Sequence, residues 1–180
     1  MNELVLRLLT PNDESAFLAG AKLWPAADLA WYAFDWQPEK PFAEYLLRLQ
    51  KNEAGIELPE NFVPSSMFYA FVDGQVVGRL HIRHKLSDAL KRRGGHVGYA
   101  VAPVYRGKGY GKAMLGLALP ICERLGIEEV LLTCADENVA SYRIIESAGG
   151  RLVERFFDEK EQIWVRRYSI VRSKFSGAAD

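Results

Sequence analysis

The segment Arg106–Lys112 combines glycines and cations at a spacing suited to binding a phosphorylated ligand. Its glycines are Gly107, Gly109 and Gly111, and its cations are Arg106, Lys108 and Lys112. An apolar run ends at Val101, shortly before the segment, and a helical pattern begins at Tyr110. Free amides at the start of a helix carry partial positive charge, and glycines let a ligand approach the backbone closely. The segment therefore predicts an anion site, most naturally for a diphosphate.

Three known patterns compete for this segment. A P-loop needs a Ser or Thr after its lysine, but Lys112 is followed by Ala113, and no glycine lies five residues before Gly111. A dinucleotide fingerprint needs G-x-G-x-x-G, whereas the spacing here is G-x-G-x-G. The third pattern, Arg106-x-x-Gly109-x-Gly111, resembles the acetyl-CoA motif of the GNAT acetyltransferase family, (Gln or Arg)-x-x-Gly-x-(Gly or Ala). The remaining interpretation is a tight glycine-rich connection that binds no ligand.

The resemblance to the GNAT family extends well beyond the loop. The run His96–Gly109 is similar to the family's fourth strand and its loop, and Asn138-x-x-Ser141 with Gly149-Gly150 is similar to its second signature. In the family the fourth and fifth strands splay apart, and the pantetheine arm lies in the gap. The resemblance therefore implies acetyl-CoA as cosubstrate. The implied cofactor-binding residues are Tyr99, Ala100, Val101, Arg106, Gly107, Lys108, Gly109, Tyr110, Gly111, Lys112, Asn138 and Ser141. Asn138 is equally well suited to cap the helix that follows it.

The resemblance also implies the fold, an α+β, three-layer acyl-CoA N-acyltransferase fold. Its central sheet is mixed, mostly antiparallel, splayed between strands 4 and 5 and flanked by helices. Hydrophobic periodicity places elements in a compatible order. The expected strands are 3–9, 67–72, 75–84, 96–101, 129–134, 152–157 and 163–171, and the expected helices begin near residues 11, 42, 110 and 138. Asp73-Gly74 is a hairpin signal, and 52–64 is expected to be a long loop. We expect one domain over residues 1–172 and a disordered tail over residues 173–180. The segments 63–65, 82–84 and 94–99 further resemble a subgroup of bacterial predicted acetyltransferases.

Acetyl transfer to an amine needs a proton acceptor for the amine and a proton source for the departing thiolate. Many family members carry a Tyr seven residues after the signature Asn, but this sequence has Ile145 there. Tyr142 is the nearest phenol and the candidate acid, and a packed or exposed helix tyrosine is the alternative interpretation. The candidate bases are His81, His84 and His96, and because His81 and His84 lie on opposite faces of their strand, only one of that pair can face a given site. Each histidine is also compatible with an ordinary hydrogen-bonded strand position.

The aromatic-rich region 20–64 is expected to cover the acceptor side, because family members vary there. It contains Trp24, Trp31 and Trp36, and its acidic residues Asp28, Asp35, Glu39 and Glu44 could attract a cationic amine. The implied function is transfer of acetyl from acetyl-CoA to a primary amine of a small molecule or peptide, directly in a ternary complex. The alternative is a non-catalytic acyl-CoA-binding or sensor module on the same fold, which the missing Tyr keeps open. Dimers are common in the family, so a homodimer is one expected assembly.

Composition limits the other classes of function. Lys plus Arg number 23 and Asp plus Glu number 23, so a general electrostatic grip on nucleic acid or an anionic membrane is not expected. Cys122 and Cys134 lack CxxC spacing, and no metal site is expected. The N-terminus lacks a basic region with a long apolar core, and no stretch approaches the roughly 20 apolar residues of a membrane span. We therefore expect a cytoplasmic protein.

Overall fold

Two antiparallel sheets form the framework of the chain, which the computed structural model describes over residues 3–171. The first sheet has the order β1-β2-β3-β4 and consists of β1 (Val5–Arg7), β2 (Ser65–Val72), β3 (Gln75–Arg83) and β4 (Val97–Val101). The second has the order β5-β7-β6 and consists of β5 (Glu129–Ala135), β6 (Arg151–Asp158) and β7 (Ile163–Val171). The disordered tail expected over residues 173–180 lies outside the described residues.

The β2–β3 hairpin is built as its sequence predicts. Val72 pairs with Gln75 across Asp73-Gly74, whose φ angles are 49° and 75°. Two consecutive residues with positive φ give a tight turn whose twist matches that of the flanking strands, and Asp-Gly adopts it readily. The hairpin fixes the register of β3, which in turn pairs with β4 on its other side.

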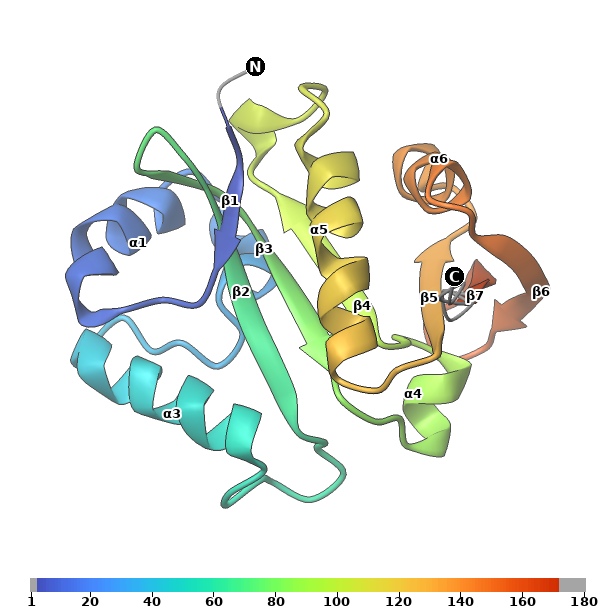
Figure 1. The fold of residues 1–180 in the computed structure, drawn as a ribbon, viewed down its shortest axis with the longest axis horizontal. Helices are drawn as coiled ribbons and strands as arrows, with labels where there is room; N and C mark the ends of the chain where they lie inside the picture. The colour runs from blue at the N-terminus through green and yellow to red at the C-terminus, as the bar shows by residue number, and fades with distance from the viewer. Residues whose placement is uncertain (1–2, 172–180) are drawn as a thin grey trace, which may run out of the picture.

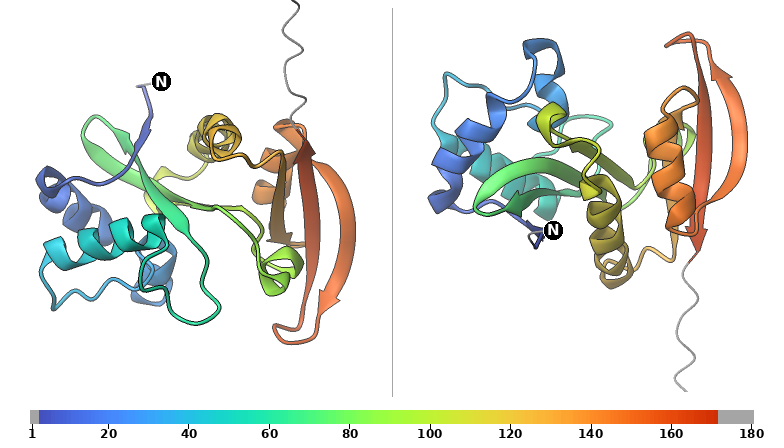
Figure 2. Two further views of the ribbon diagram at one scale, coloured as in Figure 1. Left: turned by 60° about the horizontal axis from the view of Figure 1, so that its bottom comes forward. Right: turned by 90° about the horizontal axis from the view of Figure 1, so that it is seen from above.

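Helices cover both faces of the first sheet (Figures 1 and 2). α5 (Tyr110–Arg124) packs against β3 and β4 on one face. α1 (Glu14–Ala21), α2 (Leu29–Tyr32) and α3 (Phe42–Ala54) cover the opposite face. The other helical segments of the described chain are α4 (Asp88–Arg92), α6 (Val139–Ser147) and the 3-10 turns η1 (Pro11–Asp13), η2 (Ala26–Asp28) and η3 (Pro103–Tyr105).

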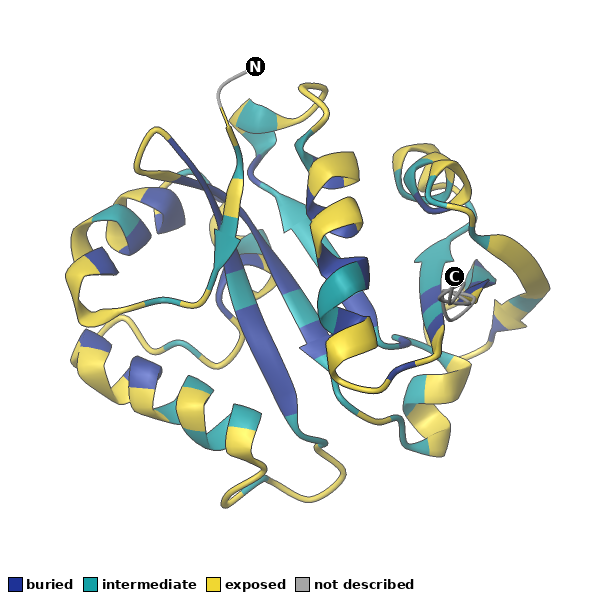
Figure 3. Cartoon of the chain, in the orientation of Figure 1, coloured by how far each residue is buried: buried dark blue, intermediate teal, exposed yellow. Residues whose placement is uncertain are grey.

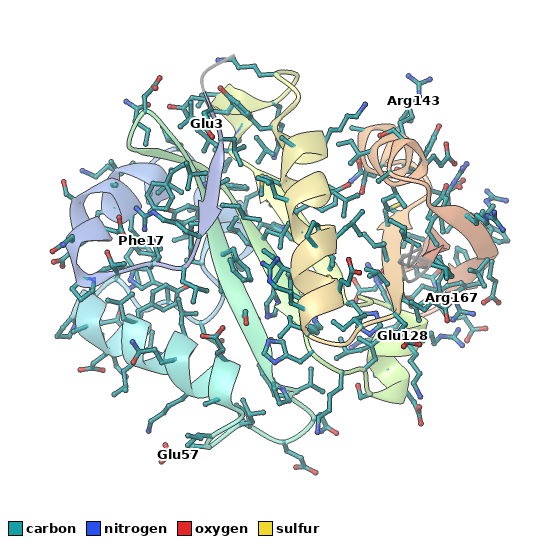
Figure 4. All side chains as sticks on the ribbon, viewed as in Figure 1. Glu3, Phe17, Glu57, Glu128, Arg143 and Arg167 are labelled. Atoms are coloured by element: carbon teal, nitrogen blue, oxygen red, sulfur yellow. The ribbon has the colours of Figure 1, made fainter. Side chains whose placement is uncertain are left out.

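Each face of the first sheet has its own hydrophobic core. Leu80 and Met114 are buried between the sheet and α5, and this core continues to Leu132 of β5. On the other face, the ring of Phe17 packs edge-on against Tyr69, with 5.6 Å between the centroids. Figure 3 shows the central strands buried and the outward sides of the helices exposed, and Figure 4 shows Phe17 among the packed side chains beneath α1. The two cores hold β4 in place from both sides.

β4 and β5 meet at one end and separate at the other. His96 donates its amide to the Leu131 carbonyl at 2.7 Å and accepts the Leu131 amide on Nδ1 at 3.0 Å. Gly95 bridges to Leu132 with a φ of +65°, and a Cβ at Gly95 would lie 2.3 Å from the Leu131 carbonyl oxygen. Beyond this junction the described residues of β4 and β5 form no ladder with each other. β4 therefore has an edge without a strand partner, and the expected splay is confirmed.

Two short helices and one helix end differ from the sequence expectation. α2 and α4, with four and five residues, lie where no helix was expected, because one turn is too short to show a helical repeat. α4 is nonetheless capped by Ser87, whose Oγ accepts the Leu90 amide at 3.4 Å. α3 runs on to Ala54, because Gly55 ends it with a φ of 72°. The long loop therefore begins at residue 55 rather than 52.

Candidate functional site

A cleft of about 630 Å³ opens along the unpaired edge of β4. Its walls come from the end of β4, the loop before α5, the first turns of α5 and α6, and the η2–α2 segment. The lining residues are Trp24, Asp28, Trp31, Tyr99, Ala100, Val101, Tyr105, Arg106, Gly107, Gly109, Tyr110, Gly111, Lys112, Asn138, Ala140, Ser141 and Ile144. Since α5 and α2 cover opposite faces of the first sheet (Figure 2), the cleft passes around the edge of β4 from one face to the other.

The loop before α5 is shaped to present backbone amides. Gly107 and Gly109 have φ angles of 75° and 81°, which favour glycine, and Gly109 is the N-cap residue of α5. The Ala113 amide bonds to the Gly109 carbonyl at 3.1 Å, so the amides of residues 110–112 have no partner within the helix. Free amides thus lie where the sequence predicts an anion site.

The three cations of this loop differ in where their side chains lie. Arg106 and Lys112 line the cleft, and Arg106 Nε donates to the Val101 carbonyl at 3.2 Å. Lys108 is not among the lining residues, and its Nζ lies 5.2 Å from the centroid of the Tyr105 ring. Arg106 and Lys112 therefore belong to the lining of the cleft, whereas Lys108 does not.

Gly111 lets α5 approach α6 closely at the wall of the cleft. A Cβ at this position would lie 3.0 Å from Ile144 Cδ1 and 3.7 Å from Tyr99 Cε2. Gly111 is buried, whereas Gly107 and Gly109 are exposed. The third glycine of the motif therefore serves helix packing as well as access to the backbone.

Tyr99 connects β4 to the start of α6 across the gap. Its hydroxyl lies 3.2 Å from Ser141 Oγ and 3.3 Å from the Ser141 carbonyl oxygen. Asn138 Oδ1 accepts the Ser141 amide at 3.0 Å, so Asn138 caps α6. Burial raises the pKa of Tyr99 to about 12, and the hydrogen bond with Ser141 opposes this shift. The Tyr99 phenol is therefore a hydrogen-bond donor at neutral pH.

Tyr142, the candidate acid, lies away from the cleft. It is half-buried on α6, and the Arg166 guanidinium lies over its ring, with Cζ 4.1 Å from the ring centroid. Its neighbour Ser141 lines the cleft, because consecutive helix residues point in different directions. The position of Tyr142 gives the acid role no support. Three other phenols line the cleft, those of Tyr99, Tyr105 and Tyr110.

The histidines named as candidate bases do not line the cleft either. Burial lowers the pKa of all three, His81, His84 and His96, and the Arg83 guanidinium lowers the pKa of His81 further. His84 Nε2 lies 2.8 Å from Ser66 Oγ, and His96 uses Nδ1 at the junction of β4 and β5. In this structure the imidazole rings of His84 and His96 form hydrogen bonds within the fold.

Several lining residues were not assigned to the site from the sequence. They are Trp24, Asp28, Trp31, Tyr105, Ala140 and Ile144. The first three come from the region 20–64, whose aromatic and acidic composition indicates the acceptor side without distinguishing its members. The available sequence signal was Asp28, with Trp24 before it and Trp31 after it within a few residues.

No group of three or more His, Cys, Asp or Glu side chains within residues 3–171 could hold a metal ion. None of the described helices is long and apolar enough to cross a membrane.

Comparison with known proteins assigns the chain to a family. The model of the acetyltransferase (GNAT) family matches residues 27–149, which is more than half of the chain and includes the cleft-lining parts of β4, α5 and α6. The chain therefore belongs to the GNAT acetyltransferase family, as the resemblance indicated. No curated protein matches the sequence.

Solved structures share the fold at low sequence identity. The structure of yncA from Salmonella typhimurium, with its cofactor acetyl-CoA, has 16% identity and a TM-score of 0.64, over 99% of each chain. RimJ from Mycobacterium smegmatis, in complex with CoA-disulfide, has 17% identity and a TM-score of 0.66, over 93% of this chain and 81% of its own. Mutant forms of the spermidine/spermine N-acetyltransferase SpeG from Vibrio cholerae have 18% identity and a TM-score of 0.61, over 99% of this chain and 100% of theirs. The expected fold class is thereby confirmed.

Proposed function

We propose that this protein transfers the acetyl group of acetyl-CoA to a primary amine, directly in a ternary complex. The observation that carries the proposal is the cleft, which joins the amides at the start of α5 to an aromatic and acidic wall on the opposite face of the sheet. A phosphorylated donor and an amine can therefore meet at the edge of β4. Membership of the acetyltransferase family, the acetyl-CoA in yncA and the activity named for SpeG support the same proposal.

The residues of the cleft fit acetyl-CoA. The amides of residues 107–112, with the side chains of Arg106 and Lys112, would hold the pyrophosphate. The main chain of Tyr99–Val101 would hold pantetheine, because an unpaired strand edge offers amides and carbonyls to an extended partner. Asn138 lies at the same wall. When bound, acetyl-CoA supplies an activated acyl group.

The proposed reaction exchanges one bond for another. The amine nitrogen bonds to the thioester carbonyl carbon, the carbon–sulfur bond breaks, and the sulfur leaves as a thiolate. One proton passes from the amine to the sulfur, directly or through water. An alkyl amine with a reference pKa of about 10.4 must lose a proton before it attacks. A main-chain amide near Val101 would stabilise the charge that develops on the carbonyl oxygen, by about 3–4 kcal/mol.

Direct transfer is favoured over a covalent acetyl-enzyme. Neither Cys122 nor Cys134 lines the cleft, and Cys122 is fully buried. Burial raises the pKa of the Cys134 thiol, which disfavours the thiolate that an acyl intermediate would need. We assign Tyr99 as the hydrogen-bond donor to the leaving sulfur, because its phenol lies at the gap between β4 and α6.

Thiol release from acetyl-CoA, measured with DTNB against a panel of alkyl amines, amino sugars and peptides, tests the proposal. We expect amine-dependent release, an equal amount of acetylated amine by mass spectrometry, and initial-velocity lines that intersect. Parallel lines would contradict direct transfer. Binding of acetyl-CoA without turnover on the whole panel would favour the sensor module instead.

A further inference from the structure

The charged side chains of the cleft are separated by sign. Among the described residues that line it, Arg106 and Lys112 are the cations and Asp28 is the one carboxylate. The cations flank the start of α5, whereas Asp28 ends η2 beside α2, on the opposite face of the first sheet. Trp24, shortly before η2, and Trp31 of α2 line the cleft with Asp28. The acceptor end is thus acidic and aromatic.

The Asp28 carboxylate is not used by the fold. Asp28 is the N-cap residue of α2, yet its side chain makes no capping hydrogen bond. No hydrogen bond or ion pair joins this carboxylate to another described residue. Since an N-cap aspartate ordinarily bonds to the helix amides, the free carboxylate is available to a ligand.

The segment that carries Asp28 is held firmly. Arg79, with 7% of its surface exposed, donates from Nε to the Trp31 carbonyl. Trp24 is 7% exposed and packs with its ring centroid 5.8 Å from that of Tyr32, whereas Trp31 is 60% exposed. Trp24 Nε1 is buried without a hydrogen-bond partner in the described chain. An unpaired buried donor is unusual and calls for an acceptor atom such as a water oxygen, because an ammonium group cannot accept its hydrogen bond.

A carboxylate that lines the same cleft as two indoles is a suitable site for a cation. Ammonium groups are attracted to the faces of tryptophan rings, and more strongly where water is excluded. We propose that Asp28, with Trp24 and Trp31, binds a second positively charged group of the acceptor, so that the preferred acceptors are small diamines or polyamines. The inference rests on the proposed acetyl transfer.

The cation on Asp28 is not the reacting amine, for a chemical reason. A carboxylate paired with an ammonium stabilises the protonated form, which has no lone pair for attack. The reacting amine must be neutral and must lie at the edge of β4, where the thioester would be held. A second ammonium on Asp28 instead positions the acceptor while its first amine is free to lose a proton.

Two amines of equal chain length, one with a second amino group and one without, test whether Asp28 binds that second group. We compare kcat/KM for 1,4-diaminobutane and 1-aminobutane in the wild type, Asp28→Asn and Asp35→Asn. Asp35 is the matched control, because it lies shortly after α2 but lines a different hollow beside α3. Its φ of 59° is one that Asn tolerates well.

The wild type and Asp35→Asn should prefer the diamine about tenfold or more. Asp28→Asn should lose that preference through a raised diamine KM, with the acetyl-CoA KM unchanged. Equal kcat/KM values for the two amines in the wild type, or a preference for the diamine that survives Asp28→Asn, would overturn the inference.

Equilibrium binding separates failure of the subsite from failure of the proposed function. Binding of 1,4-diaminobutane to the CoA-loaded protein is followed by calorimetry and by tryptophan fluorescence. Binding that depends on Asp28, without any acetylation, would support the subsite and contradict the acetyl transfer. Acetylation of both amines with equal, Asp28-independent binding would support the transfer and contradict the subsite.

Discussion

At the scale of single residues, Tyr99 and Tyr142 have contrasting surroundings. The Tyr99 hydroxyl lies 3.2 Å from Ser141 Oγ at the wall of the cleft. The Tyr142 ring lies instead against the Arg166 guanidinium, outside the cleft lining. Burial raises the pKa of Tyr99 to about 12, so its phenol remains a donor across the range in which an amine acetyltransferase would be assayed.

The two phenols can be compared by removing each hydroxyl. Tyr99→Phe should raise the acetyl-CoA KM about fivefold, because one hydrogen bond between β4 and α6 is lost, and should lower kcat about tenfold or more. Tyr142→Phe, which keeps its stacked ring, should change both constants by about twofold or less. Steady-state thiol release measures both. A loss of kcat of about 100-fold in Tyr142→Phe, with Tyr99→Phe near the wild type, would return the acid role to Tyr142.

The residues that the sequence could locate are those whose backbone positions the two family signatures specify. Tyr99, Gly111 and Asn138 line one cleft because each follows from the strand, the loop or the helix start that the signatures define. Asp28 and Trp31 could not be located in this way. They belong to a much earlier segment, and only packing against β3 brings that segment to the edge of β4.

At the scale of elements, His96 is the side chain that joins the two sheets. Its Nδ1 accepts the Leu131 amide, which requires that this nitrogen be unprotonated. Burial lowers the pKa of His96, with Glu129 opposing and Arg83 adding to the shift. A group whose pKa is lowered by folding stabilises the fold above its unfolded pKa of about 6.5, and this contribution is lost as the pH falls.

Substitution of His96 should therefore change stability in a pH-dependent way. His96→Asn supplies an amide oxygen as acceptor but does not titrate, so its free energy of unfolding should fall less between pH 7 and 5 than that of the wild type. His96→Leu leaves the Leu131 amide unpaired and should cost about 1–3 kcal/mol at pH 7. Urea unfolding at several pH values provides the measurement. Identical pH profiles for the wild type and His96→Asn would show that His96 does not titrate with folding.

α5 contains a glycine whose replacement should be favourable. Gly116 lies on its exposed side, and a Cβ there would meet no atom within 4 Å. Gly116→Ala should stabilise the protein by about 0.5–1 kcal/mol, because alanine loses less backbone entropy in a helix. Thermal unfolding should show a Tm higher by about 1–4 °C, with unchanged acetyl-CoA binding. Pro120 lies inside α5, and its ring crowds the carbonyl of Gly116, four residues earlier. A lower Tm would indicate that the helix needs Gly116 to accommodate this proline.

The sequence predicted the elements with strong local signals and missed those without them. The Asp73-Gly74 turn and the strand Ile163–Val171 were located to the residue. α2 and α4 were missed because each is a single turn, too short to show a helical repeat. Arg79 holds the end of α2 through the Trp31 carbonyl, a contact between residues far apart in the chain.

At the scale of the whole molecule, the proposed function depends on two sheets that meet and then diverge. The junction at His96 keeps one end closed, and the divergence leaves the edge of β4 unpaired inside the protein (Figure 1). Helices on both faces protect that edge from other strands. The resulting cleft connects a helix N-terminus on one face with an acidic, aromatic wall on the other, and the proposed two-substrate transfer uses both.

The most direct test of this account is calorimetric titration with acetyl-CoA, ATP and NAD. The wild type should bind acetyl-CoA far more tightly than ATP or NAD. Lys112→Gln should weaken acetyl-CoA binding about tenfold, because a charge-assisted contact with the pyrophosphate is lost. Arg143→Gln is the matched control, since Arg143 is exposed on α6 and points outward (Figure 4). Binding of NAD or ATP as tight as that of acetyl-CoA, or equal affinities for Lys112→Gln and Arg143→Gln, would contradict the assignment of the cleft.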